Sequence, residues 1–213
     1  MSNNEPTQLT TVADIVKVFN TVDNNAEVTS APESISLLKD LTALFLAKPA
    51  NEIAAYVAIT DTGLVSDTLV RMVGLYENGS EERKAVVAKR LSLVDEFVKA
   101  GQHGVANAWL VRGYCVYPGG SEEQMSVVAK GVSLVDEFVK AGNFDLADTW
   151  LVRGYAVYPS GSEEQKAVVA KGEQILSLKS SKQMGAAPKI DIGALSRIAK
   201  QELAKIRVAG LSH

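Results

Sequence analysis

Few side chains in this sequence have the type and spacing needed for catalysis. The chain contains two histidines, His103 and His213, and one cysteine, Cys115. None of them has a serine, cysteine or carboxylate at a spacing typical of a nucleophile and its base, or of a metal-ligand cluster. A glycine-rich phosphate-binding loop is also missing. We therefore predict no catalytic residue, no cofactor-binding residue, no metal ligand and no enzymatic activity.

The histidine and the cysteine inside the chain each have a simple structural interpretation. His103 occupies the position that Phe144 holds 41 residues later, in a segment that we expect to be a solvent-facing loop between helices. Cys115 corresponds to Gly74 and Ala156, so its position favours a small residue rather than a reactive thiol.

Basic residues recur more regularly, and they are the candidates for binding. Arginines repeat every 41 residues, and so do lysines: Arg71, Arg112, Arg153, and Lys48, Lys89, Lys130, Lys171. Equivalent residues of stacked repeats form rows, and a row of guanidinium groups could bind an extended acidic peptide through bidentate contacts. Alternatively, each arginine pairs with a carboxylate of the adjacent repeat, such as Asp95 or Glu96, and the recurrence reflects shared ancestry. We predict these residues as candidate partner-binding residues.

These rows follow from a repeat of 41 residues. Segments 80–120 and 121–161 are identical at 28 of their 41 positions. A diverged copy covers 39–79, and a partial fourth copy covers 162–178. Repetition of this kind is typical of stacked arrays in which each unit buries its apolar face against its neighbours.

Each repeat has the pattern of amphipathic helices. In segment 80–100, apolar residues recur at spacings of three and four, as on one face of a helix. Ser121 with Gln124 predicts an N-terminal capping box, and Ser162 with Gln165 repeats it.

Glycines and prolines predict where the helices end, at Gly101, Pro118, Gly142 and Pro159. The first helix of a repeat could be broken in its middle, and the equivalent positions there hold Pro49, Arg90, Gly131 and Gly172. The pattern therefore allows two or three helices per repeat.

Two tryptophans recur with the repeat, Trp109 and Trp150. They share an apolar stripe with small alanine and glycine positions, so we predict that both are buried between helices. The alternative is an aromatic wall that binds a ligand.

The spacing of apolar and small residues resembles the tetratricopeptide helix pair. The matching positions are Leu93, Phe97, Gly101, Ala106, Gly113 and Pro118, and again Leu134, Phe138, Gly142, Ala147, Gly154 and Pro159. A period of 41 exceeds the usual tetratricopeptide repeat by about seven residues and is more similar to armadillo or HEAT repeats. The asparagine with which armadillo proteins hold peptide backbones has no counterpart here, the nearest position being Gly154. All three families imply an all-α, right-handed α-solenoid, here with three to four repeats.

The sequence before the repeats predicts a different structure. We expect residues 1–10 to be disordered and residues 11–38 to form N-terminal capping helices, with Thr11 and Ser30 as helix N-caps.

The sequence after the repeats carries most of the positive charge. Residues 179–189 read as a linker and 190–213 as a basic amphipathic helix. The net charge is −3, with 13 Lys+Arg against 22 Asp+Glu in residues 1–164 and 9 against 3 in residues 165–213. A basic tail on an acidic body predicts that the tail meets an acidic surface, of its own chain or of a neighbour. The acidic body argues against nucleic-acid binding.

Composition sets the remaining expectations. The chain is 46% hydrophobic and 22% charged, as in ordinary globular proteins, and its longest apolar run, 54–59, is far shorter than a membrane helix needs. With a single cysteine and no secretion signal at the start, we expect a cytoplasmic protein, signal-less secretion being the alternative. We predict a non-enzymatic scaffold or adaptor that binds a protein or acidic peptide. The alternative is a self-assembling subunit whose basic C-terminal helix docks on the acidic body of a neighbour.

Overall fold

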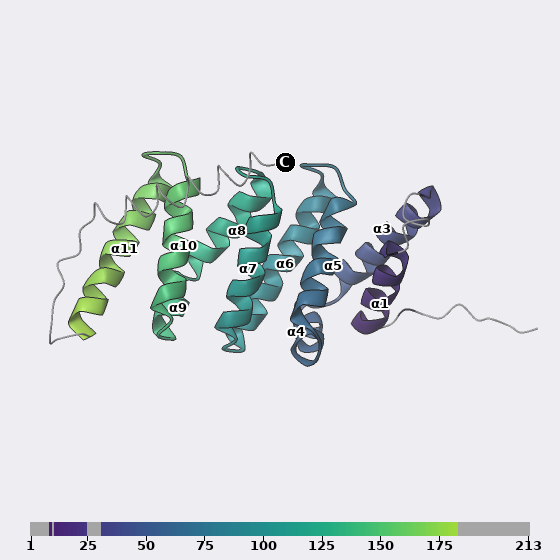
Figure 1. Ribbon diagram of the computed structural model, residues 1–213, viewed down its shortest axis with the longest axis horizontal. Coiled ribbons are helices and arrows are strands. Elements are labelled where there is room, and N and C mark those ends of the chain that lie inside the picture. The colour runs from purple at the N-terminus through teal and green to yellow at the C-terminus, as the bar shows by residue number, and fades with distance from the viewer. Residues whose placement is uncertain (1–8, 10, 25–30, 183–213) are drawn as a thin grey trace, which may run out of the picture. The chain divides into compact units, whose positions relative to one another are not determined.

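The computed structural model describes residues 9, 11–24 and 31–182 of the chain, and the regular elements in these ranges are all α-helices (Figure 1). The prediction of an all-α fold is therefore confirmed for this part of the chain. None of its helices is long and apolar enough to cross a membrane. The chain divides into two compact units, Met1–Val127 and Val128–His213.

The first unit contains six complete helices among its described residues and the beginning of another. They are α1 (Val12–Asp23), α3 (Pro32–Ala47), α4 (Ala50–Ile59), α5 (Thr62–Gly74), α6 (Glu81–Lys99), α7 (His103–Val116) and the start of α8 (Glu122–Ser133). Helix α1 packs against α3, α4 and α5, while α6 packs against α4, α5 and α7. The core between them is aliphatic and aromatic and includes Ile15, Phe19, Leu41, Phe45, Val57, Leu69, Val94 and Phe97.

The second unit contains the end of α8, followed by α9 (Val135–Lys140), α10 (Phe144–Val157) and α11 (Glu163–Lys182). Helix α10 packs against both α9 and α11. Its core includes Val135, Phe138, Ala147, Trp150 and Val168.

The predicted helix ends are confirmed. Helices α6 and α9 stop two residues before Gly101 and Gly142, which adopt φ values of 72° and 78°. Only glycine reaches this left-handed region without steric cost. Helices α7 and α10 stop two residues before Pro118 and Pro159, which cannot continue a helix.

The predicted N-caps are partly confirmed. The Thr11 hydroxyl accepts a hydrogen bond from the Asp14 backbone N–H at 3.1 Å, and the Asp14 carboxylate returns to Thr11 in a complete capping box. The prediction of Ser30 as the next cap was wrong. The N-cap of α3 is Ala31 instead, because Pro32 lacks an N–H and fits the first helical position.

The two capping serines inside the repeats behave as predicted, but the glutamines do not. Ser121 accepts from the Gln124 N–H at 3.2 Å, as expected of an N-cap. The Gln124 side chain then accepts from Gly120, one residue before the serine, and donates to the Tyr114 carbonyl. The copy around Gln165 makes the same contacts, so this glutamine joins two successive helices of the repeat.

The number of helices per repeat varies, and the residue at the equivalent position does not decide this alone, because glycine stands there both in a broken copy and in an unbroken one. The helix breaks at Pro49, between α3 and α4, and just after Gly131, between α8 and α9. It continues through Arg90 in α6 and through Gly172 in α11.

Two of the predicted segment boundaries fall inside helices. Helix α3 runs across the expected junction at residue 38, and α11 extends into the expected linker as far as Lys182. The predicted disordered start, apart from residue 9, lies outside the described residues. The rest of the linker and the basic C-terminal helix also lie outside them.

Candidate functional site

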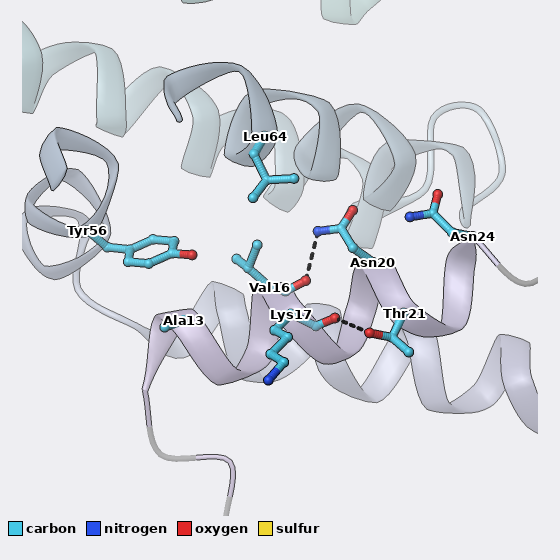
Figure 2. A pocket seen from close by; sticks show the side chains of 8 residues that line it. All are labelled: Ala13, Val16, Lys17, Asn20, Thr21, Asn24, Tyr56 and Leu64. Carbon is cyan, nitrogen blue, oxygen red and sulfur yellow. Dashed lines mark hydrogen bonds between the residues drawn. The ribbon is translucent and has the colours of Figure 1, made fainter. Parts of the chain in front are cut away.

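An open groove of about 520 Å³ lies between helices α1, α4 and α5 (Figure 2). It is lined by Ala13, Val16, Lys17, Asn20, Thr21, Asn24, Tyr56 and Leu64. Val16 forms an apolar floor, and Figure 2 shows Leu64 and the Tyr56 ring turned toward it from α5 and α4. Its volume is typical of sites that bind small ligands or single peptide side chains.

The apolar surface continues beyond the groove. Leu64 is 38% exposed, and Ile59, the last residue of α4, is 84% exposed. Residues three apart lie on the same side of a helix, so Ile59 extends the side of α4 that carries Tyr56. We call Val16, Tyr56, Ile59 and Leu64 the apolar surface of the groove.

Hydrogen bonds fix the floor of the groove. The Asn20 amide donates to the Val16 carbonyl at 2.8 Å and to the Thr68 hydroxyl at 3.0 Å, linking α1 to α5. Thr68 in turn donates to the Leu64 carbonyl at 2.8 Å. Because Asn20 is nearly buried, this network holds α1 and α5 at a set spacing under the groove.

The C-terminal end of α1 is held by Arg71 of α5. The Arg71 guanidinium lies 2.6 Å from the Asp23 carboxylate and also donates to the Asn24 side-chain oxygen at 3.0 Å. With its oxygen engaged, Asn24 presents the N–H groups of its amide to the groove. The Thr21 hydroxyl donates to the Lys17 carbonyl at 2.8 Å and so keeps only acceptor capacity.

Lys17 is unusual among the cationic side chains that the structure describes. It has no ion pair, hydrogen bond or aromatic ring as its partner among the residues whose side chains the structure describes, whereas the other lysines and arginines of that set each have one. The two carboxylates of its own helix take part in other contacts, Asp14 with Thr11 and Asp23 with Arg71. Within the described part of the chain, the groove is therefore lined by a lysine that has no partner.

The predicted arginine row is engaged within the protein. Arg71 pairs with Asp23 of α1, and Arg112 of α7 pairs with Asp67 of α5. Each of these two arginines thus binds a carboxylate of another helix, as the alternative interpretation expected. The carboxylates are not Asp95 or Glu96, which that interpretation gave as examples. Arg153 lies over the Trp150 ring, 4.7 Å from its centroid. The row as a ligand site remains a prediction.

The predicted lysine row is also engaged. Lys89 donates to the Lys48 carbonyl at the end of α3, at 2.7 Å, and burial lowers the pKa of its ammonium group. Lys48 pairs with Glu52, and Lys171 pairs with Asp136 at 2.5 Å. Lys130 has an interaction partner as well. These contacts join helix ends and neighbouring helices, and the row as a partner-binding surface stays a prediction.

Both tryptophans are buried, as predicted, at 2% exposure for Trp109 and 0% for Trp150. They pack differently despite the similarity of their repeats. Trp150 lies against Gly131, where a Cβ would be 2.1 Å from the ring. The equivalent of Gly131 is Arg90, whose guanidinium lies 5.7 Å from the Trp109 ring centroid.

Arg90 is a buried charge, only 1% exposed. It donates to the Ser66 hydroxyl at 2.6 Å and to the Trp109 carbonyl at 3.3 Å, and within the described residues it has no carboxylate in ion-pair contact. Burial lowers the pKa of Arg90, and burial raises the pKa of the neighbouring Tyr117. This cluster lies in the packed core between α5, α6 and α7, and none of its residues lines the groove beside α1.

A buried ion pair joins α6 and α8. Arg83 lies 2.5 Å from Glu123, and both side chains are about nine-tenths buried. Burial alone would raise the pKa of Glu123, but hydrogen bonds from its own backbone N–H, Arg83 and Ser121 outweigh it, so the pKa is lowered. Arg83 also contacts the Val73 carbonyl at 3.4 Å near the end of α5. The pair therefore stabilises the packing of three helices.

His103 and Cys115 both lie on helix α7. His103 is the first residue of α7, so the prediction of a loop was wrong; its Nδ1 lies 3.1 Å from the Gly101 carbonyl. Cys115 is an exposed thiol on α7. Within the described ranges, no three His, Cys, Asp or Glu side chains come together in a way that could hold a metal ion.

The groove was not found from the sequence. Lys17, Asn20 and Asn24 precede the repeats, so no recurrence marks them, and Tyr56 and Leu64 lie in the most diverged copy. The one available signal was Lys17, which is the single basic residue of positions 1–38 and lies on the polar side of a predicted amphipathic helix.

Together these observations show that the described part of the chain is all-helical and that an open, partly apolar groove lined by Lys17 lies beside α1. No family model, no curated protein and no solved structure matches the chain.

Proposed function

We propose that this protein is a non-enzymatic interaction scaffold whose helical repeats stack into a right-handed α-solenoid. The groove between α1, α4 and α5 is its partner-binding site. The observation that carries this proposal is the apolar lining of the groove by Val16, Tyr56 and Leu64, of which Leu64 is 38% exposed. Apolar surface of this kind is costly in water and is typical of sites that bind protein or peptide partners.

The rigidity of the site supports the proposal. Asn20 and Thr68 link the two helices that form its walls, and Arg71 fixes the end of α1. A site whose walls are held before binding loses less conformational entropy when a partner arrives. The engaged arginine and lysine rows would then stabilise the helical array that supports the groove.

The test is selection of a random peptide library displayed on phage against the immobilised full-length chain. We expect peptides that bind the wild type and lose binding to Leu64→Asp, which places a charge on the apolar surface. The matched control is Leu178→Asp, because Leu178 of α11 is similarly exposed, at 47%, and lies outside the groove. Circular dichroism checks that both variants are folded. A selection that yields no peptide sensitive to Leu64→Asp contradicts the proposal.

A second candidate function is self-assembly through the C-terminal segment. Its support is the charge separation, −9 over residues 1–164 and +6 over residues 165–213. Deletion of 190–213 should then convert an oligomer into a monomer in light scattering, more readily at high salt, where exposed charges are screened. If wild type and truncated chain have the same size at every protein concentration, this candidate fails.

A further inference from the structure

The polar groups around the groove indicate which partner it fits, an inference that rests on the proposed function. Lys17 contributes an ammonium group, and Asn24 contributes amide N–H groups because its oxygen accepts from Arg71. Thr21 has already used its hydroxyl proton on the Lys17 carbonyl. The groove also holds acceptors, the Thr21 oxygen and the buried Asn20 Oδ1, which has no hydrogen-bond partner among the described residues. The Lys17 ammonium is the charged group of this set, and it favours a ligand that supplies hydrogen-bond acceptors.

Charge points to the same class of ligand. Within the described residues Lys17 has no acidic partner, and the two carboxylates of its own helix, Asp14 and Asp23, contact Thr11 and Arg71 instead. A carboxylate arriving beside Lys17 would gain a charge-assisted hydrogen bond without displacing an existing pair. A cationic ligand would instead be repelled by the Lys17 ammonium group.

The apolar part of the groove indicates that the ligand also carries a large apolar side chain. Val16, Tyr56 and Leu64 surround space for a large side chain, and Figure 2 shows the Tyr56 hydroxyl directed into it. Helix α1 rises 1.5 Å per residue, so Lys17 and Asn24 are about 10 Å apart along its axis. Two or three residues of an extended peptide cover that distance.

From these features we infer that the groove binds an acidic peptide segment of a partner protein, one large apolar residue entering beside Tyr56 and Leu64. A carboxylate within the next two or three residues pairs with Lys17. The ligand is distinct from the one predicted for the arginine row, whose members Arg71 and Arg112 are already paired with aspartates.

The test uses the full-length chain and fluorescein-labelled hexapeptides of sequence Gly-Ser-X-Glu-Glu-Gly, where X is Leu, Phe or Trp. Matched peptides carry Gln-Gln or Lys-Lys in place of Glu-Glu. By fluorescence anisotropy at low salt, we expect the acidic peptides to bind best. Lys17→Gln should weaken them about three- to fivefold, as for exposed ion pairs, and Lys17→Glu by tenfold or more.

The matched control is Lys140→Gln, which makes the same change in net charge on an exposed helix surface in the second unit. It should leave the affinity within about twofold of the wild type, because long-range charge effects are largely screened.

Three results overturn the inference. The first is absence of binding by every acidic peptide at millimolar concentration. The second is that the Gln-Gln peptides bind as tightly as the Glu-Glu peptides and lose as much affinity in Leu64→Asp. In that case the groove remains a peptide site and the proposed function stands. The third is binding that appears only after deletion of residues 1–8, which assigns the groove to the chain's own amino-terminal segment.

Discussion

Gly131→Ala tests whether the Trp150 ring packs against Gly131, the contact that distinguishes this repeat from the one before it. Alanine is normally preferred over glycine inside a helix, by about 0.5–1 kcal/mol. Here the added methyl carbon would lie 2.1 Å from Cε3 and 2.2 Å from Cδ2 of Trp150. The substitution should therefore destabilise the protein, against the usual preference.

The size of the effect follows from the packing. Carbon atoms in contact are best placed about 3.5–4.0 Å apart, so the ring must move by roughly 1.4 Å. Trp150 has no exposed surface, and the same helix is confined at Gly154, where a Cβ would be 2.8 Å from Val132. Overpacking of this kind costs about 1–3 kcal/mol or more, which exceeds the gain in helix propensity. We expect a net loss of about 1–2 kcal/mol and a fall in Tm of about 2–8 °C.

The matched control is Gly172→Ala, at the equivalent position one repeat later in α11. A Cβ at Gly172 would meet only Leu151, at 4.0 Å, an ordinary contact. This variant should gain about 0.5–1 kcal/mol. The assay is guanidinium denaturation followed by circular dichroism and tryptophan fluorescence.

A double-mutant cycle with Trp150→Phe tests the proposed cause directly. The smaller ring should relieve part of the clash, so the double variant should lose less stability than the sum of the single variants. Equal stabilisation by Gly131→Ala and Gly172→Ala would refute the reasoning, because it would mean that the Trp150 ring does not occupy the space beside Gly131.

Three further substitutions test the core. Trp109→Ala should cost about 3–5 kcal/mol, as large core truncations do, and a loss below about 1 kcal/mol in a denaturant titration would indicate an exposed ring. Glu123→Gln should cost about 3 kcal/mol at pH 7, because it leaves Arg83 buried without its counter-ion. Since the folded pKa of Glu123 is lowered below its unfolded value near 4.3, its stabilisation is complete above that value and is lost as the pH falls through the folded pKa. The difference between wild type and variant should therefore shrink in urea titrations between about pH 5 and pH 3, and a constant difference would contradict this assignment. Arg90→Met should be neutral or stabilising by up to about 2 kcal/mol in thermal denaturation, because no carboxylate pairs with the buried guanidinium; a clear loss of stability would show that the charge is compensated.

Local features of the fold could be predicted from the sequence because they depend on residues close in the chain. The helix ends at Gly101 and Pro118 follow from backbone geometry, and the Thr11 cap follows from a hydroxyl next to the first turn. The burial of Trp109 and Trp150 followed from helical periodicity, which places them on the apolar side. The Ser30 cap failed because Pro32 moved the start of α3 by one residue, a competition between two local signals.

The candidate site could not be predicted, since it depends on which helices meet. The groove brings together Lys17, Tyr56 and Leu64 from three helices, and their spacing in the sequence carries no information about that meeting. Likewise, the recurrence of Arg71 and Arg112 showed that the arginines form a series, but only the packing of α1, α5 and α7 decided that each would bind an aspartate. Sequence alone determined the all-helical class, the repeat and the helix ends, because hydrogen bonding and backbone sterics act within a few residues. The tertiary structure decided which side chains are satisfied and which remain available for a partner, because ion pairing and burial depend on contacts between residues tens of positions apart.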